Sequence, residues 1–401
     1  MAQALLGRHP EPIFTIDAES EPVQSANTLG ILPEFQRCSF LPESAATRAP
    51  GGTAVRRHDG LADDNRTILL PGASVVLGET TYYLSVKGVG TRSPMFGFAD
   101  IFPAGGRSAW AGASLDEHWR ERAYHAPVFT GEMWFGGGPY GASGEEGPSD
   151  SVRITEMAGD TPQNINGFWI CPVLAYNRLP EWLVSSFEGS YWYRRWRAGW
   201  FQEIRLVPSD VRLYFHSEAP IGVKPQQVLS AFGVDDADQM DAFIERFIAS
   251  GVGALTLAAR TAKPCENGFE LLDYDDVWLD KDSVIAPDGT IHFADIDDVE
   301  WRRFDDGAGA RKKMARQFER NFYEFMFGLD SLMSERDRMA GRIPSVAQRR
   351  AELGARYEMA LAADKFARTE SSAAGVDLVL SPPCGEVGQV TIRLVDYAGG
   401  A

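Results

Sequence analysis

Lysine, cysteine and long apolar runs are all scarce in this chain of 401 residues. Only seven of its 39 basic residues are lysines, and Lys87 is the only one before Lys224. The four cysteines are widely separated and form no C-x-x-C pair, which argues against a disulfide framework or a zinc knuckle. This usage predicts a reducing, cytoplasmic location.

Features that would direct the chain to a membrane are also missing. No apolar run approaches the roughly 18 residues that a membrane span requires. The first residues, "MAQALLGRHPEP", show no basic segment followed by a long apolar stretch, so we expect no signal peptide. The sequence therefore predicts a protein without a membrane partner.

Positive charge is in deficit as well. The formal net charge is -17, which makes this an acidic protein. A field of that sign repels nucleic acid and anionic lipid, so neither is an expected partner. The same charge also serves solubility, and on its own it indicates no particular function.

The distribution of strand-like and helix-like patterns predicts an α+β fold with two lobes, because strand patterns dominate early and helix patterns later. A chain of this length is long enough for two domains. The predicted parts are an N-terminal extension at 1–67, a β-rich N-lobe at 68–218 with a loop-rich insertion at about 88–150, a helical C-lobe at 219–370, and a C-terminal β-hairpin at 371–401.

A short hairpin within the C-lobe, at about 275–298, is the clearest chemical feature. In "DSVIAPDGTIHFAD" the residues Pro287–Thr290 predict a turn between two short apolar strands. The acidic residues that flank these strands are Asp280 and Asp282 before the first, and Asp295, Asp297 and Asp298 after the second. Because the turn reverses the chain, we expect the two acidic groups at one end of the hairpin. Paired carboxylates of this kind are a ligand set for Mg²⁺.

Lys87 and two groups of glycines predict a phosphate-binding site. Lys87 ends a predicted strand in "YYLSVKGVG", and an ammonium on a flexible stem reaches phosphate where a planar guanidinium would not fit. Gly88 and Gly90 beside it would leave room for a ligand. Gly136, Gly137 and Gly138 in "FGGGPYGASG" form either a phosphate-cradling loop, through their backbone N–H groups, or an ordinary flexible loop.

These motifs resemble, in their order, those of protein-kinase-like enzymes, and most closely the selenoprotein O-type pseudokinases that transfer AMP. The resemblance aligns Asp295 with the family's metal-binding aspartate. Ser283, with Asp282 beside it, falls on the metal-binding asparagine position. It further implies that Lys87 grips phosphates and that Glu156, in "TEMAG", orients that lysine.

The function that this resemblance implies is an ATP–Mg²⁺-dependent transferase with a nucleotide bound between the lobes. The transferred group, phosphoryl or adenylyl, stays open. The acceptor, a protein or a small molecule, is unknown.

Three departures from the family keep other functions open. No G-x-G-x-x-G motif precedes Lys87, and 69 residues separate Lys87 from Glu156. The family's catalytic aspartate position falls on Trp278, which cannot act as a base. A non-catalytic nucleotide- or peptide-binding module is therefore an alternative, with "YWYRRWRAGW" at 191–200 as a binding segment. An ATP-grasp ligase is a weaker one, since it also uses a strand lysine, a later glycine-rich loop and late carboxylates.

Overall fold

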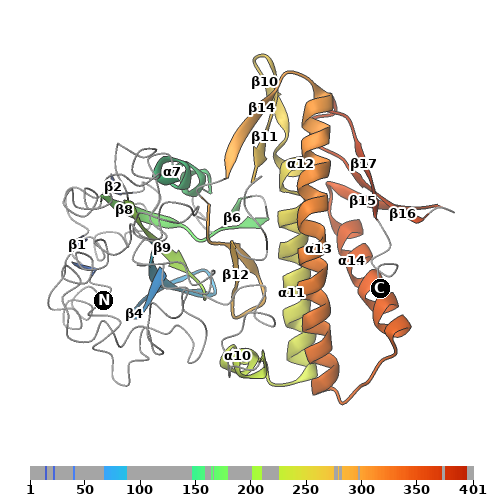
Figure 1. Ribbon diagram of the computed structural model, residues 1–401, viewed down its shortest axis with the longest axis horizontal. Coiled ribbons are helices and arrows are strands. Elements are labelled where there is room, and N and C mark those ends of the chain that lie inside the picture. Colours follow the sequence, from blue (N-terminus) through green and yellow to red (C-terminus); the bar gives the residue numbers. More distant parts are fainter. Residues whose placement is uncertain are drawn as a thin grey trace, which may run out of the picture. The chain divides into compact units, whose positions relative to one another are not determined.

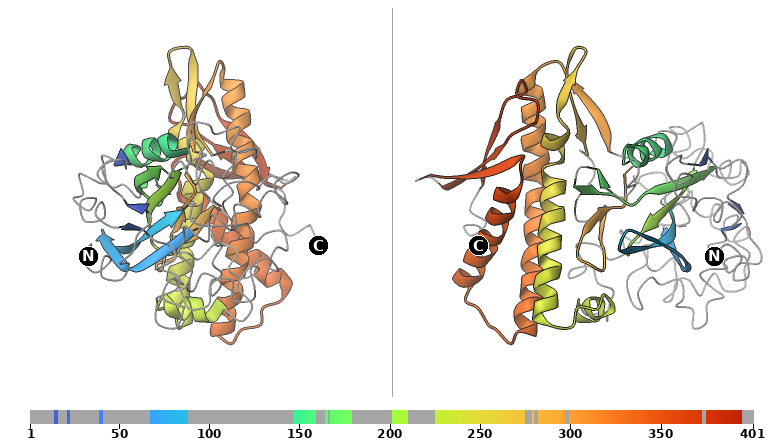
Figure 2. Two further views of the ribbon diagram at one scale, coloured as in Figure 1. Left: turned by 60° about the vertical axis from the view of Figure 1, so that its left-hand side comes forward. Right: turned by 180° about the vertical axis from the view of Figure 1, so that it is seen from behind.

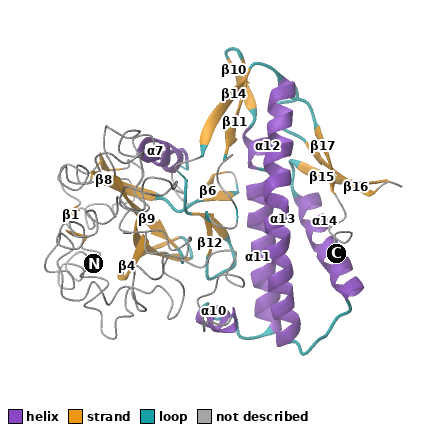
Figure 3. Cartoon of the chain, in the orientation of Figure 1, coloured by secondary structure: helices purple, strands orange, loops and turns teal. Residues whose placement is uncertain are grey.

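The fold is known from a computed structural model that divides the chain into two compact units. Unit 1 comprises Met1–Pro162 and Cys171–Asp210, and unit 2 comprises Gln163–Ile170 and Val211–Ala401. The residues described are 14–15, 21–22, 39–40, 67–87, 147–158, 164–165, 167–178, 201–209, 225–274, 279, 282–296, 299–372 and 375–394. Figure 1 labels most of their helices and strands, and Figure 3 colours them by type.

Unit 1 contains a five-stranded antiparallel sheet in the order β2-β8-β9-β5-β4. Its strands are β2 (Glu21–Pro22), β4 (Thr67–Leu77), β5 (Thr80–Lys87), β8 (Val173–Arg178) and β9 (Phe201–Val207). Strands β4 and β5 form a hairpin, and Gly78 supplies the positive φ of 63° that its turn requires. A separate pair joins β1 (Phe14–Thr15) to β3 (Ser39–Phe40).

Helix α7 (Gly147–Met157) packs against β8 in unit 1. Ser151, Ile154 and Thr155 are buried, and the latter two follow Ser151 by three and four positions, as expected for the inner face of a helix. The hydroxyl of Thr155 accepts a hydrogen bond from the backbone N of Val173, 3.0 Å away. This contact attaches the helix to the first residue of β8.

Two long helices, which lie side by side in both views of Figure 2, form the centre of unit 2. The helices of this unit are α10 (Pro225–Ala231), α11 (Ala237–Leu255), α12 (Leu257–Thr261), α13 (Gly307–Met339) and α14 (Val346–Ala363). The buried apolar side chains of α11 and α13 pack against each other, and the rings of Phe247 and Phe325 stack with centroids 5.5 Å apart. Asp236 begins α11 with a capping box, in which its side chain accepts from the backbone N of Gln239.

A buried arginine joins α11, α13 and α14. Arg336 of α13 lies 3.2 Å from Asp241 on α11, 2.6 Å from Glu352 on α14 and 2.9 Å from its neighbour Asp337. Hydrogen bonding to Glu352 raises the pKa of Arg336, and the same bond lowers the pKa of Glu352. The Arg336 guanidinium is only 4% exposed, and its carboxylate partners come from all three helices, so the network links these helices to one another.

Short antiparallel sheets complete unit 2. Two of these sheets have two strands: β6 (Asn164–Ile165) pairs with β7 (Phe168–Trp169), and β12 (Ser283–Ile285) pairs with β13 (Ile291–Phe293). A three-stranded sheet contains β10 (Lys263–Cys265), β11 (Gly268–Asp273) and β14 (Glu300–Phe304). A second three-stranded sheet contains β15 (Ala367–Ser372), β16 (Gly375–Leu380) and β17 (Val390–Leu394). The predicted C-terminal hairpin is β16–β17, and β15 adds a third strand that its polar sequence did not indicate.

Helices and several antiparallel sheets together confirm the predicted α+β class. The finer kinase-like, two-lobed arrangement stays a prediction. In the part of the chain that the structure describes, no helix combines the length and the apolar character of a membrane span.

We expect Gly253→Ala to destabilise unit 2, because α11 passes very close to the β6–β7 turn at this residue. A Cβ on Gly253 would lie 2.1 Å from the carbonyl oxygen of Gly167, which is backbone and cannot rotate away. Overpacking of this kind costs about 1–3 kcal/mol in the free energy of unfolding, measured by urea denaturation.

Gly354→Ala is the matched control for this substitution. Gly354 is also helical, and the nearest atom to its added Cβ is 4.0 Å away, on Tyr357. Alanine there should stabilise by about 0.5–1 kcal/mol through its helix propensity. If both variants shifted the urea midpoint in the same direction, the close approach at Gly253 would be refuted.

Candidate functional site

The hairpin β12–β13 in unit 2 has the turn that its sequence predicted. Ala286 donates its backbone N–H to the carbonyl of Thr290 at 2.8 Å, and Gly289 adopts a φ of 100°. The Asp288 carboxylate accepts from the backbone N of Thr290 at 2.9 Å and from its hydroxyl at 2.7 Å. These hydrogen bonds fix the turn, so the two strands pair in a defined register and their other ends lie side by side.

Asp282 and Asp295 meet at the open end of this hairpin. The carbonyl oxygen of Asp282 accepts from the backbone N of Ala294 at 2.8 Å and from the backbone N of Asp295 at 3.2 Å. Asp282 is buried, and Asp295 is half-buried. The hairpin therefore brings one acidic residue from each strand end together, which is the arrangement on which the metal-site prediction depends.

An aromatic cluster holds the strand that leads into Asp295. The ring of Phe293 lies 4.5 Å from that of Phe168 and 5.4 Å from that of Tyr274, measured between centroids. All three side chains are buried, and an isolated bridge pairs Phe293 with Ile170. Burial, with the charge of Asp273 second, raises the pKa of Tyr274, so its phenol is a neutral donor to the carbonyl of Ala254. The backbone just before Asp295 is thus anchored in a packed core.

The other two predicted metal ligands are Ser283 and Asp297. The hydroxyl of Ser283 is buried and donates to the carbonyl of Leu279, so its proton is committed to the local backbone. Asp297 lies outside the described residues, as do Asp280 and Trp278. The assignment of Ser283 and Asp297 as ligands stays a prediction.

The chemistry of Asp282 and Asp295 suits Mg²⁺ better than it suits a closed metal cage. Within the described ranges, no group of three or more His, Cys, Asp or Glu side chains is placed to hold a metal ion. Structural zinc sites need about four such ligands, whereas Mg²⁺ takes one or two carboxylates and fills its remaining positions with water or phosphate. Two neighbouring acidic residues fit the second pattern.

His292 lies inside the hairpin and is fully buried. Its Nε2 is 2.9 Å from the hydroxyl oxygen of Thr290, its Nδ1 is 3.4 Å from the carbonyl oxygen of Ile170, and its ring centroid is 5.3 Å from that of Trp169. Burial lowers the pKa of His292 to about 4. The imidazole is therefore neutral at physiological pH and serves the packing of the hairpin.

Lys87 is the last residue of β5 in unit 1, where it stands in register between Thr67 of β4 and Glu203 of β9. Its side chain lies outside the described part. Glu156, the predicted partner of Lys87, is exposed on α7. Gly88, Gly90, Gly136, Gly137 and Gly138 lie outside the described residues.

Sequence reasoning missed a buried carboxylate beside Lys87. Glu203 is 2% exposed, its Oε2 accepts from the hydroxyl of Ser151 on α7 at 3.0 Å, and its Oε1 lies 3.1 Å from Nη1 of Arg205. The signal available in "FQEIRLV" was the two-residue spacing of Glu203 and Arg205, which places both on one face of a strand.

A second buried ion pair, also missed, lies in unit 2. Lys313 of α13 is 2.8 Å from Asp273 at the end of β11, and Arg302 of β14 reaches the same carboxylate oxygen at 2.8 Å. Asp273 is 1% exposed and Lys313 7%. The pair attaches the three-stranded sheet to α13, which gives this lysine a structural role.

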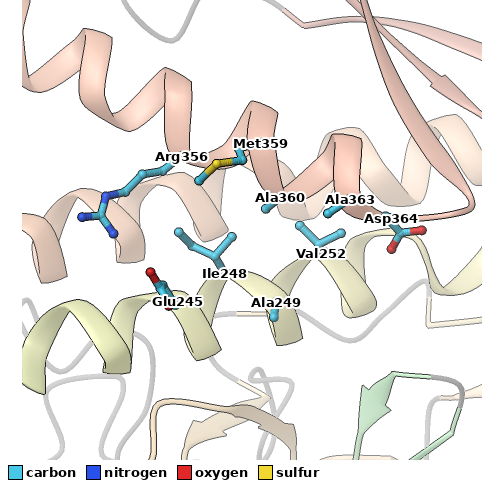
Figure 4. Close-up of a pocket in the computed structure, with 9 residues that line it drawn as sticks. All are labelled: Glu245, Ile248, Ala249, Val252, Arg356, Met359, Ala360, Ala363 and Asp364. Carbon is cyan, nitrogen blue, oxygen red and sulfur yellow. The ribbon is translucent and has the colours of Figure 1, made fainter.

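A pocket of about 580 Å³ opens between α11 and α14. Figure 4 shows that its lining comes from both helices, with the apolar Ile248, Val252 and Met359 between them and Arg356 and Asp364 near its two ends. None of the predicted site residues lines it. The pocket is therefore a feature separate from the hairpin.

Comparison with known proteins adds no relative to this description: no family model, curated protein or solved structure matches the chain.

Within each unit, the structure gives one predicted acidic or basic residue a charged neighbour. In unit 2 it places Asp282 beside Asp295, and in unit 1 it places Lys87 opposite Glu203.

The buried state of His292 predicts a pH-dependent loss of stability. Its folded pKa of about 4 lies below the ordinary value of 6.5, so below pH 6.5 the unfolded chain takes up a proton that the folded chain refuses. Stability from this group is complete above pH 6.5 and is lost as the pH falls toward 4. The loss is about 3 kcal/mol, from about 1.4 kcal/mol for each pKa unit.

Urea denaturation at pH 7 and pH 4.5 measures this loss, with His292→Gln as the comparison. We expect the free energy of unfolding to fall more steeply in the wild-type protein than in the variant, since carboxylate titration is common to both and cancels. Equal pH dependence in the two proteins would show that the imidazole is accessible to protons in the fold.

Proposed function

We propose that this chain is an ATP–Mg²⁺-dependent transferase that moves a phosphoryl or an adenylyl group. The observation that supports this most is the hairpin β12–β13, which sets Asp282 and Asp295 next to each other on a core-anchored backbone. A preorganised pair of acidic residues is what a metal–nucleotide site needs from the protein.

The roles of the residues follow from their chemistry. Asp282 and Asp295 would hold Mg²⁺, and Lys87 at the end of β5 would bind phosphate oxygens. When bound, Mg²⁺ would neutralise charge on the phosphates of the nucleotide. The protein's own contribution would be positioning and charge neutralisation, which account for most of the catalysis of such transfers.

The tryptophan at position 278 bears on which reaction is catalysed, and not on whether nucleotide binds. Phosphoryl transfer depends mostly on positioning and electrostatics, so an enzyme can lack the usual aspartate base and still transfer a group. A protein that binds ATP without transferring any group is the alternative, and the transfer experiment below distinguishes the two.

Lys87→Ala and Asp295→Ala should each weaken ATP binding at least tenfold in isothermal titration calorimetry. A charge-assisted hydrogen bond contributes about 1.5–3 kcal/mol, which corresponds to about 10–100-fold in affinity. Asp295→Ala should also remove the difference in affinity between ATP with Mg²⁺ and ATP with EDTA, because that difference depends on the metal ligand.

Lys263→Ala and Asp305→Ala are the matched controls for the binding experiment. Lys263 is an exposed lysine whose Nζ lies over the Trp301 ring, and Asp305 is an exposed acidic residue just before α13. Both controls remove the same charge at positions without a proposed ligand role. Unchanged ATP affinity in Lys87→Ala and Asp295→Ala, or equal losses in the controls, would overturn the proposal.

Incubation with ATP labelled at the α-phosphate or at the γ-phosphate distinguishes adenylyl transfer from phosphoryl transfer. Label from the γ-phosphate appearing on the protein or on an added acceptor indicates phosphoryl transfer, and label from the α-phosphate indicates adenylyl transfer. We expect one of the two, and we expect Asp295→Ala to abolish it. Binding without transfer of either label would indicate the non-catalytic module.

A further inference from the structure

The pocket between α11 and α14 is lined by matching stretches of the two helices. On each helix the later lining residues follow the first by three, four and seven positions, which places them on one face: Glu245, Ile248, Ala249 and Val252 on α11, and Arg356, Met359, Ala360 and Ala363 on α14. Seven residues of α-helix rise about 10 Å, so the pocket is a groove of about that length. Figure 4 shows Glu245 and Arg356 toward one end of this groove and Asp364 toward the other.

Ion pairs link the elements that border the groove at both of its ends. At one end, Arg356 of α14 lies 2.6 Å from Asp241 of α11. At the other end, Asp364, the residue that follows α14, pairs with Arg260 of α12, the helix that comes next after α11. The lining between these ends includes three alanines, whose single methyl groups leave space that a larger side chain would fill. The groove is therefore part of the folded structure before any ligand arrives, as most ligand pockets are.

The size and lining of the groove suit a small and largely apolar molecule. Its volume of about 580 Å³ lies within the range of about 300–1,000 Å³ that is usual for small-molecule sites, which combine an apolar lining with a few polar groups. Ile248 and Val252 are buried within it, whereas Met359 is 70% exposed. An unbranched thioether is flexible and adapts its shape to an apolar ligand that it contacts.

The charged residues of the lining differ in whether they are already paired. Arg356 is paired with Asp241, and Asp364 is paired with Arg260. Glu245 is exposed and takes part in no ion pair within the described part of the chain. A charged ligand in the groove would therefore meet the carboxylate of Glu245 as an unpaired charge, and that charge favours a cation.

We propose that this groove binds a primary amine that carries an unbranched apolar chain, with the ammonium beside Glu245 and the chain along Ile248 and Val252. The ammonium would donate a charge-assisted hydrogen bond to the carboxylate, and the chain would bind because it leaves water. The net charge of -17 attracts cations over a longer range and disfavours an anion of the same shape. The inference is independent of the proposed function, because none of the residues assigned to Mg²⁺ or to phosphate lines the groove.

Calorimetric titration of the wild-type protein with octylamine, octanol and octanoate tests the class of ligand, because these probes share a chain length and differ in charge. We expect octylamine to bind about two- to fivefold more tightly than octanol, which is the contribution of one exposed ion pair, and octanoate to bind most weakly. Butylamine should bind at least about tenfold more weakly than octylamine, because its chain buries four fewer methylene groups.

These probes also give results that would contradict the proposal in the wild-type protein alone. If octanol or octanoate bound as tightly as octylamine, the ligand would not be an amine. Equal affinities for butylamine and octylamine would show that the ammonium meets a surface charge and that the groove does not hold the chain. A titration in which neither amine binds would also overturn the proposal.

Glu245→Gln tests the carboxylate that the ammonium is expected to meet. It should remove the preference for octylamine over octanol and leave the affinity for octanol unchanged. Glu319→Gln is the matched control, since Glu319 is an exposed glutamate on α13 that does not line the groove. Added salt should reduce the same preference in the wild-type protein, because it screens exposed charges. A preference that persists in Glu245→Gln would refute the role of this residue.

Ala363→Trp tests whether the probes bind in the groove. The indole would occupy the space of the chain, so the affinity for octylamine and for octanol should fall at least about fivefold. Ala362→Trp is the matched control, because Ala362 is the neighbouring exposed alanine and does not line the groove. Unchanged affinity in Ala363→Trp, or equal losses in the two variants, would show that the probes bind elsewhere. Circular dichroism checks that both variants fold, and the wild-type comparison decides the ligand class without them.

Discussion

Buried charge that must be neutralised in place is the constraint on which both units depend. Arg336 is held by acceptors on three helices, Asp273 by Lys313 and Arg302, and Glu203 by Arg205 and Ser151. An uncompensated charge inside a protein is very costly, so each of these groups demands its partner at bonding distance. Apolar packing allows small shifts between elements, whereas these pairs tolerate little.

The proposed chemistry uses the same constraint in two ways. In unit 2, packing and backbone hydrogen bonds bring Asp282 and Asp295 together at the end of the hairpin, where the proposed metal would bind. In unit 1, Glu203 is paired with Arg205 and stands in register opposite Lys87. One site is acidic and the other basic, as binding of a metal and of phosphate respectively would require.

Local patterns predicted the elements well where one face of an element is apolar. The stripes of α11 and α13 and the turns at Gly78 and Gly289 follow from spacing and from backbone conformations that glycine adopts easily. The same reasoning missed β15, whose sequence "ARTESS" carries no apolar alternation and pairs because β16 lies beside it. The role of Glu156, which came from the order of motifs, stays a prediction.

The sequence by itself determined the α+β class, the β12–β13 hairpin and the meeting of acidic residues at its end, because a turn and two short apolar strands are local features. Only the tertiary structure decided that Glu203 is buried opposite Lys87 while Glu156 faces solvent. Register between β5 and β9 joins residues more than a hundred positions apart. No local pattern encodes such a pairing, since it arises from the packing of the whole sheet and of α7 upon it.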